Sequence, residues 1–154
     1  MGDPKRRSEK RSPGKRASKP LKNFTLYLDE NFDCGEVKSA LLANKIKFRI
    51  YSEFFKPGSE DPDILDLAGK HGWAMLTIDR KNRYRELERK SIFRHRVRQF
   101  IFSANLGGAA LAKLIVEVYP KMRKFARENE RPFVAVVTKG GDIYGRMNHL
   151  GKSF

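Results

Sequence analysis

The stretch of sequence that decides the fold is Phe24-Thr25-Leu26-Tyr27-Leu28-Asp29-Glu30-Asn31. In it, a run of β-branched, aromatic and aliphatic side chains leads directly into two carboxylates and an amide. A near-continuous apolar run is typical of a strand buried inside a sheet. Open α/β sheets hold their sites outside the carboxyl ends of such strands. We therefore expect Asp29 at a strand end, half-buried, with its charge directed into a crevice.

Two interpretations of Asp29 follow from this position. A half-buried carboxylate costs on the order of several kcal/mol unless a cation or hydrogen-bond donors meet it, which favours a functional site. The alternative is structural: Asp29-Glu30-Asn31 caps the next helix, because Asp and Asn are favoured N-cap residues. The stretch taken alone favours neither, so the choice depends on the rest of the chain.

The remaining segments alternate between strand and helix patterns, which predicts parallel βαβ units and an α/β fold. Strands are expected near 24–28, 47–51, 74–77, 99–102 and 133–137. Helices are expected near 34–44, 62–71 and 107–127, with a short basic helix between 80 and 98. Asp61 is the expected N-cap of the helix at 62–71, and Gly72 is expected to end it. Gly140-Gly141-Asp142 predicts a hairpin turn into a last strand at 143–147, with glycine supplying a positive φ.

Length and composition predict one domain with a substantial core. A chain of 154 residues with 40% hydrophobic side chains buries roughly two-thirds of its unfolded surface. Residues 1–22 contain nine Lys or Arg against Asp3 and Glu9, so they are expected to form a disordered basic tail ahead of a single domain at 23–154. The one cysteine, Cys34, excludes an internal disulfide and a multi-cysteine zinc site. With no signal-like or membrane-spanning apolar run, a cytoplasmic protein is expected.

The net charge of +15 points to a polyanionic partner. The tail carries +7 of it, so the body keeps +8. Excess charge of this size favours nucleic acid through counterion release, and solubility alone is the alternative explanation. The densest basic segment is Arg80 to Arg98, with nine Lys or Arg against two Glu, and it is expected to lie on the body with a basic outer face. Trp73 is expected in the core and not as a base-stacking platform.

Three carboxylates recur at comparable places in the predicted fold. Asp29 and Asp79 each end a strand, and Asp61 starts the helix between them. Strand ends and helix starts of a parallel sheet meet on one edge, so the three can converge. Converging carboxylates repel one another unless a divalent cation lies between them, and an oxygen-rich site suits Mg²⁺ or Mn²⁺. An acidic metal site within a basic body is the electrostatic layout of a phosphodiesterase.

These motifs resemble the PIN-like superfamily. The resemblance rests on Leu28-Asp29-Glu30-Asn31, on the helix segment from Ser59 to Ala68, and on Leu76-Thr77-Ile78-Asp79-Arg80. It covers residues 24 to about 82, and is closest to a branch with an Asp-Glu-Asn opening that includes ribonuclease toxins of toxin–antitoxin pairs. The resemblance implies a three-layer α/β/α sandwich that gathers acidic residues around Mg²⁺ or Mn²⁺ and cleaves RNA.

Carried over by position, the resemblance implies specific roles. Asp29, Asp61 and Asp79 would be the metal ligands, and Thr77 would position Asp79 or a water. Arg80, Lys81, Arg83 and Arg85 would hold RNA phosphates beside this site. Members often have a further acid two residues beyond the Asp79 position, where this chain has Lys81. That departure leaves the fourth acidic position open; the candidates are Glu30, Asp63 and Asp142.

The prediction is therefore a metal-dependent endoribonuclease, the toxin of a toxin–antitoxin pair, with RNA as its substrate. A cognate antitoxin protein is the implied partner, and a homodimer is left open. The main rival is an RNA-binding module of the same fold that has lost catalysis, in which the carboxylates serve as caps. A second rival is a module whose basic surface only docks an acidic antitoxin segment.

Overall fold

The structure, a computed structural model, describes residues 24–60, 62–78, 86–103 and 106–154, so the basic tail predicted at 1–22 lies outside it. Across these residues a six-stranded sheet has the order β2-β1-β3-β4-β5-β6. Its strands are β1 (Leu26–Leu28), β2 (Phe48–Ile50), β3 (Ala74–Ile78), β4 (Arg98–Phe102), β5 (Phe133–Val137) and β6 (Ile143–Met147). The first five are parallel and β6 is antiparallel to β5. The predicted mostly parallel sheet is confirmed.

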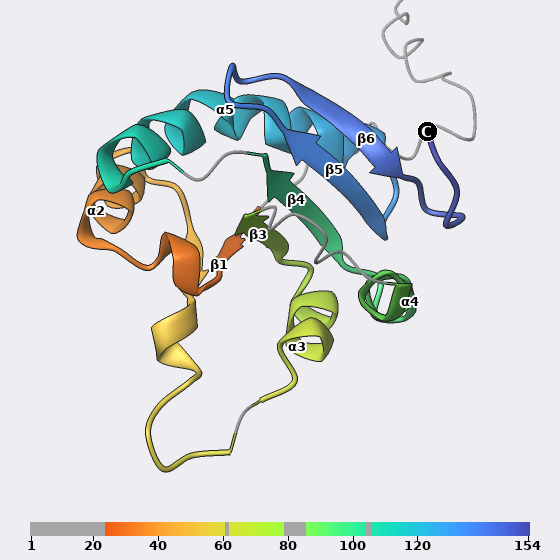
Figure 1. The fold of residues 1–154 in the computed structure, drawn as a ribbon, viewed down its shortest axis with the longest axis horizontal. Coiled ribbons are helices and arrows are strands. Elements are labelled where there is room, and N and C mark those ends of the chain that lie inside the picture. Colours follow the sequence, from red (N-terminus) through yellow and green to blue (C-terminus); the bar gives the residue numbers. More distant parts are fainter. Residues whose placement is uncertain (1–23, 61, 79–85, 104–105) are drawn as a thin grey trace, which may run out of the picture.

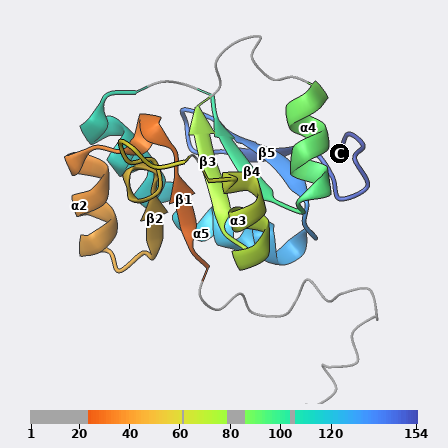
Figure 2. The ribbon, with the colours of Figure 1, turned by 90° about the horizontal axis from the view of Figure 1, so that it is seen from below.

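Helices cover both faces of this sheet and complete the expected three layers (Figure 1). On one face lie α2 (Gly35–Ala43) and α5 (Gly108–Glu128), whose apolar sides share one core with the sheet. On the other lie α3 (Ile64–His71) and α4 (Glu86–Arg94), as the view from below shows (Figure 2). Two short 3-10 helices, η2 (Glu30–Phe32) and η3 (Tyr51–Glu53), follow β1 and β2.

Strand β1 is an interior strand, as the opening stretch predicts. It pairs with β2 on one side and β3 on the other. Leu26 and Leu28 pack in the core under α2 and α5, whereas Tyr27 packs on the opposite face with the residues under α3. Because both faces are covered, an apolar residue is needed at every position, which explains the unbroken run.

Helix α5 is the longest helix among the described residues, and its buried side is the predicted one. The expected face is buried throughout: Leu111, Leu114, Ile115, Val118 and Met122. Its opposite side is polar and charged, which is the amphipathic pattern of a helix that covers a sheet.

Among the helices that the structure describes, none combines the length and the apolar character of a membrane span.

The start of α3 differs from the prediction. Asp63, not Asp61, is the N-cap, and its Oδ1 accepts a hydrogen bond of 3.1 Å from the backbone N–H of Asp66. Both aspartates have N-cap chemistry, but the helix begins at Ile64, the first residue that packs against the sheet. Its end is as predicted, since Gly72 adopts the left-handed conformation with φ of 71°.

The predicted hairpin between the last two strands is confirmed. The backbone N–H of Gly141 donates to the carbonyl of Thr138 at 2.9 Å, and that of Thr138 donates to the carbonyl of Asp142 at 2.8 Å. Gly141 has φ of 93°, which glycine adopts without steric cost. Strand β6 thereby closes the sheet beside β5 and brings the C-terminal segment toward α4.

Candidate active site at the carboxyl edge of the sheet

The chain changes direction across the sheet at β1. After β1 it adds β2 on one side and then crosses over to add β3 on the other. In open α/β sheets such a switch point leaves a crevice outside the carboxyl ends of the two diverging strands. Asp29 follows β1 directly, and because Leu28 pairs with Leu76, Asp29 comes at the level of Thr77 in β3. Two predicted site residues therefore lie at neighbouring positions on this edge.

Asp29 is partly buried and caps a short helix. Its Oδ1 accepts a hydrogen bond of 2.9 Å from the backbone N–H of Asn31, at the start of η2. The structural interpretation of Asp29 is thus confirmed, with η2 as the capped element; α2 begins after Cys34, which makes no side-chain cap bond. An ionised carboxylate has about four acceptor sites, so one cap bond is compatible with a cation on the same group.

The pKa of Tyr27 is raised by burial and by the charges at this edge. Burial, followed by the charge of Asp29, raises the pKa of Tyr27 well above its usual range. Asp33 and Glu53 contribute in the same direction. Asp29, Asp33 and Glu53 thus place negative charge near the Tyr27 phenol, although the chain as a whole is strongly basic.

Asp33 and Glu53 themselves have partners that tie the loops of this edge together. Asp33 accepts from the backbone N–H of Ser52 at 3.2 Å and pairs with Lys38 at 3.4 Å. Glu53 pairs with Arg49 at 2.8 Å. The Asp33–Ser52 contact joins η3 to the segment between η2 and α2, so Asp33 and Glu53 have structural roles at this edge.

Thr77 is held by a residue that the sequence analysis did not identify. Gln99 in β4 donates from Nε2 to Thr77 Oγ1 at 3.4 Å. Its Oε1 is buried and has no hydrogen-bond partner among the described residues. The signal in the sequence is an amide that opens the otherwise apolar run Gln99-Phe100-Ile101-Phe102.

A second missed residue is Glu36, in the first turn of α2. A Cβ atom placed on Gly108 would lie 2.7 Å from Glu36 Oε1, so this carboxylate sits against the first residue of α5. The start of a helix favours negative charge, and glycine leaves the space for it. The available signal was four acids without a cation between positions 29 and 36.

The remaining predicted site residues lie outside the described residues. These are Asp61, Asp79, Arg80, Lys81, Arg83 and Arg85. Asp79 directly follows Ile78, the last residue of β3. In the part of the chain that the structure describes, no group of three or more acidic, His or Cys side chains could hold a metal ion. Asp29 is thus the single described member of the predicted ligand set.

The candidates for a fourth acid occupy different places. Glu30 is exposed and adjoins Asp29 in η2. The carboxylate of Asp63 accepts the cap hydrogen bond at the start of α3. Asp142 follows β5, which lies three strand spacings, about 14 Å, from β1. Of the three, the geometry favours Glu30.

A three-layer α/β sandwich with a carboxylate at the switch point of a parallel sheet defines the class of this domain. The comparison with protein families then matches a PIN like domain over residues 25–104, which is more than half of the chain, so the protein belongs to the PIN-like family. PIN-like domains are often nucleases, and membership therefore gives the chain nuclease potential. The comparisons with curated proteins and with solved structures gave no significant match.

Proposed function

We propose that this protein is a metal-dependent endoribonuclease that hydrolyses RNA phosphodiester bonds at the carboxyl edge of β1 and β3. The observation that carries the proposal is the position of Asp29, partly buried at the switch point of a PIN-like sheet and level with Thr77. The carboxylates of Asp29, Asp33 and Glu53 add negative charge near the same edge, which supports a cation there.

In this proposal the ligands of Mg²⁺ or Mn²⁺ are Asp29, Asp61 and Asp79. Asp29, the one described member of this set, offers a carboxylate, which is a hard oxygen ligand of the kind that Mg²⁺ and Mn²⁺ bind. A bound divalent cation supplies an activated water and stabilises charge on the leaving oxygen. Asp29 holds its orientation through the bond to Asn31, so its carboxylate is fixed before any ligand arrives.

Thr77 is proposed as a positioning residue. Its hydroxyl accepts from Gln99 Nε2, which leaves the hydroxyl proton to be donated to a neighbouring acceptor. In this proposal the acceptor is Asp79 or a water. The buried, unpaired Oε1 of Gln99 offers a further acceptor for a water proton beside Thr77.

Arg80, Lys81, Arg83 and Arg85 are proposed to hold phosphates next to this site. The excess charge of the body supports that role. Reversing Arg83 and Arg85 to Glu is expected to weaken RNA binding and to flatten its salt dependence, because fewer counterions are then released. An unchanged salt slope would move the RNA path elsewhere.

The test is a cleavage assay on total RNA with Mg²⁺, with Mn²⁺ and with a chelator. Cleavage is expected with either metal and is expected to stop with the chelator and in the Asp29→Asn variant. Asp142→Asn is the matched control, because it removes a carboxylate from the same edge three strands away. Metal-independent cleavage, or equal cleavage by Asp29→Asn and wild type, would contradict the proposal.

The second candidate function is an RNA-binding or antitoxin-docking module without catalysis. It is favoured by the cap bond of Asp29 and by Lys81 at a position that is often acidic in the family. Binding of RNA without cleavage under all three metal conditions supports it. A toxin role in a toxin–antitoxin pair and a cytoplasmic location belong to the nuclease proposal, and co-purification of a specific inhibitory protein tests the pairing.

A further inference from the structure

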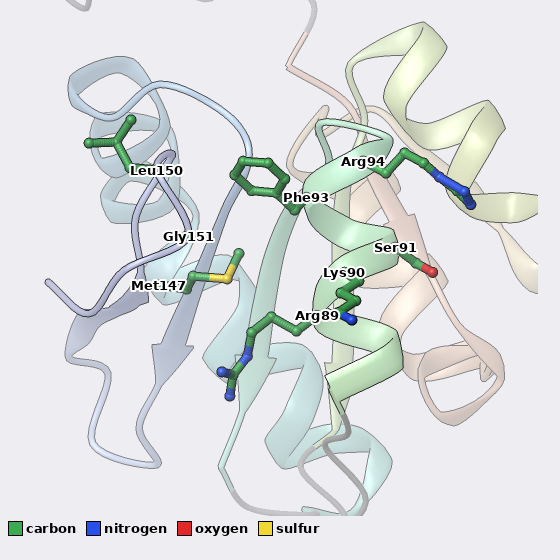
Figure 3. Close-up of a pocket in the computed structure, with 8 residues that line it drawn as sticks. All are labelled: Arg89, Lys90, Ser91, Phe93, Arg94, Met147, Leu150 and Gly151. Atoms are coloured by element: carbon green, nitrogen blue, oxygen red, sulfur yellow. The ribbon is translucent and has the colours of Figure 1, made fainter.

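A groove lies on the α4 side of the molecule, separate from the carboxyl edge of β1. It encloses about 570 Å³ between α4 and the C-terminal segment, and its lining combines apolar and basic side chains (Figure 3). On one side are Phe93 and Arg89 of α4, which extend toward the C-terminal segment. On the other are Met147, at the end of β6, and Leu150.

The far wall of this groove is an organised turn. The Asn148 side chain accepts from the backbone N–H groups of Leu150 at 2.9 Å and of Lys152 at 3.1 Å. Gly151 adopts φ of 80°, and a Cβ atom built on it would lie 3.6 Å from the Phe93 ring. The backbone at Gly151 therefore lies close to the ring, while 44% of Phe93 stays exposed.

The groove has the chemistry that binds a nucleotide. Phe93 offers an exposed aromatic ring beside Met147 and Leu150, and no carboxylate is among the described residues that line the space. Arg89 and Lys90 lie four and three positions before Phe93, so they share its face of α4, and both are exposed. Aromatic stacking of bases combined with basic side chains along the backbone is the general mode of single-strand binding.

We propose that this groove binds one nucleotide of single-stranded RNA, with the base stacked on Phe93 and its phosphates held by Arg89 and Lys90. The inference deepens the proposed function and rests on it, because it names a substrate contact outside the cleavage site. A peptide helix is less well matched, since such a ligand needs several apolar anchors along the groove, and the described lining offers one ring and two aliphatic side chains.

The position of α4 links the groove to the candidate active site. The helix begins seven residues after Asp79 and runs back along β4, so Arg89 comes nearer the carboxyl edge than Phe93 does. A strand of RNA that leaves the carboxyl edge along α4 therefore meets Arg89 first and Phe93 second. The groove sets how far the bound strand extends from the site of cleavage.

The test is fluorescence anisotropy of a labelled ten-nucleotide single-stranded RNA in buffer with chelator, so that cleavage plays no part. Phe93→Leu keeps the apolar contact and loses the ring, and is expected to weaken binding about fivefold to tenfold. Phe93→Trp is expected to bind at least as tightly as wild type. Lys90→Gln is expected to lower the salt slope by about 1. Leu42→Ala, which truncates an exposed side chain on α2, is the control and is expected to match wild type.

Two results would overturn the inference. One is RNA binding by Phe93→Leu that equals RNA binding by wild type. If wild type then also binds an acidic peptide of Glu and Leu and Phe93→Leu does not, the groove belongs to a protein partner. The other comes from wild type alone: an oligoribonucleotide with 5-iodouridine is expected to crosslink to the peptide that contains Phe93, and crosslinks confined to other peptides would contradict the site. Neither the anisotropy nor the crosslinking depends on cleavage. A protein that fails to cleave RNA can therefore still pass both tests, so failure of the nuclease proposal is distinguishable from failure of this inference.

Discussion

The carboxylate of Asp29 accepts a hydrogen bond of 2.9 Å from the backbone N–H of Asn31, two residues further along the chain. This bond fixes the carboxylate at the end of β1 and begins η2. The same residue is therefore a structural cap and, in the proposed function, a ligand of the divalent cation. The two roles respond differently to substitution, which allows them to be separated.

Replacing Asp29 by Asn and by Ala separates cap from charge. Asn is nearly as good a cap as Asp, so Asp29→Asn is expected to keep the free energy of unfolding within about 0.5 kcal/mol of wild type. Asp29→Ala loses the cap bond and is expected to cost about 1 kcal/mol. Urea unfolding followed by circular dichroism measures both. Equal losses in the two variants would mean that the charge, and not the cap, supports the fold.

The contact between Thr77 and Gln99 is testable by a double-mutant cycle. Thr77→Val keeps the shape and removes the acceptor of Gln99 Nε2, so it is expected to destabilise the fold by about 1 to 2 kcal/mol. Thr77→Ser keeps the hydroxyl and is expected to cost less. With Gln99→Leu as the second change, the coupling energy is expected to be about 0.5 to 1 kcal/mol. A coupling of zero would show that the two side chains act independently, and Gln99 would lose its assigned role.

Two glycines on the helices provide a matched pair. A Cβ atom on Gly69 would clash with the carbonyl oxygen of His95, whereas one on Gly35 would meet nothing within 4 Å. Gly69→Ala is therefore expected to destabilise the protein by about 3 kcal/mol, because the loop after α4 must move away from α3. Gly35→Ala is expected to be neutral or stabilising by about 0.5 kcal/mol, as for other helical glycines. Melting temperatures rank the pair, and similar values for both would argue against this close packing of α3.

Alkaline pH tests the environment of Tyr27. Its pKa is raised in the folded state by burial and by Asp29, while an unfolded tyrosine has a pKa of about 10. Above pH 10 the unfolded chain thus loses a proton that the folded chain keeps, and stability falls as the pH rises. Between pH 9 and pH 11 wild type is expected to lose about 1 kcal/mol more than Tyr27→Phe, as measured by urea unfolding at each pH. Equal losses would contradict the raised pKa of Tyr27 in the folded protein.

Local sequence patterns predicted the strands and helices, because burial determines where apolar residues occur: at every position of a buried strand, and along one side of a helix that covers a sheet. The run before Asp29 became β1, the amphipathic spacing at 107–127 became α5, and Trp73 is buried as expected. Competition between similar residues was harder to resolve. Asp61 and Asp63 have equal cap chemistry, and only packing of Ile64 on the sheet selects Asp63.

Contacts between distant segments were not predictable from spacing. Gln99 in β4 contacts Thr77 in the neighbouring strand β3, and Glu36 in α2 lies against Gly108 in α5. Both contacts depend on the order in which the strands join the sheet. The same holds for the groove, since Phe93 and Met147 come together only because β6 follows β5 at the end of the sheet. Asp29 was identified because a charge directly after a buried strand is visible in the sequence itself.

The central claim is that Asp29 binds a divalent cation, and calorimetric titration with Mn²⁺ tests it most directly. Wild type is expected to bind one Mn²⁺, and Asp29→Asn to bind it at least about tenfold more weakly, because a charged ligand is lost while the cap is kept. Asp61→Asn and Asp79→Asn are expected to behave like Asp29→Asn, and Asp142→Asn like wild type. Equal Mn²⁺ affinity in wild type and Asp29→Asn would contradict the metal site and, with it, the proposed nuclease.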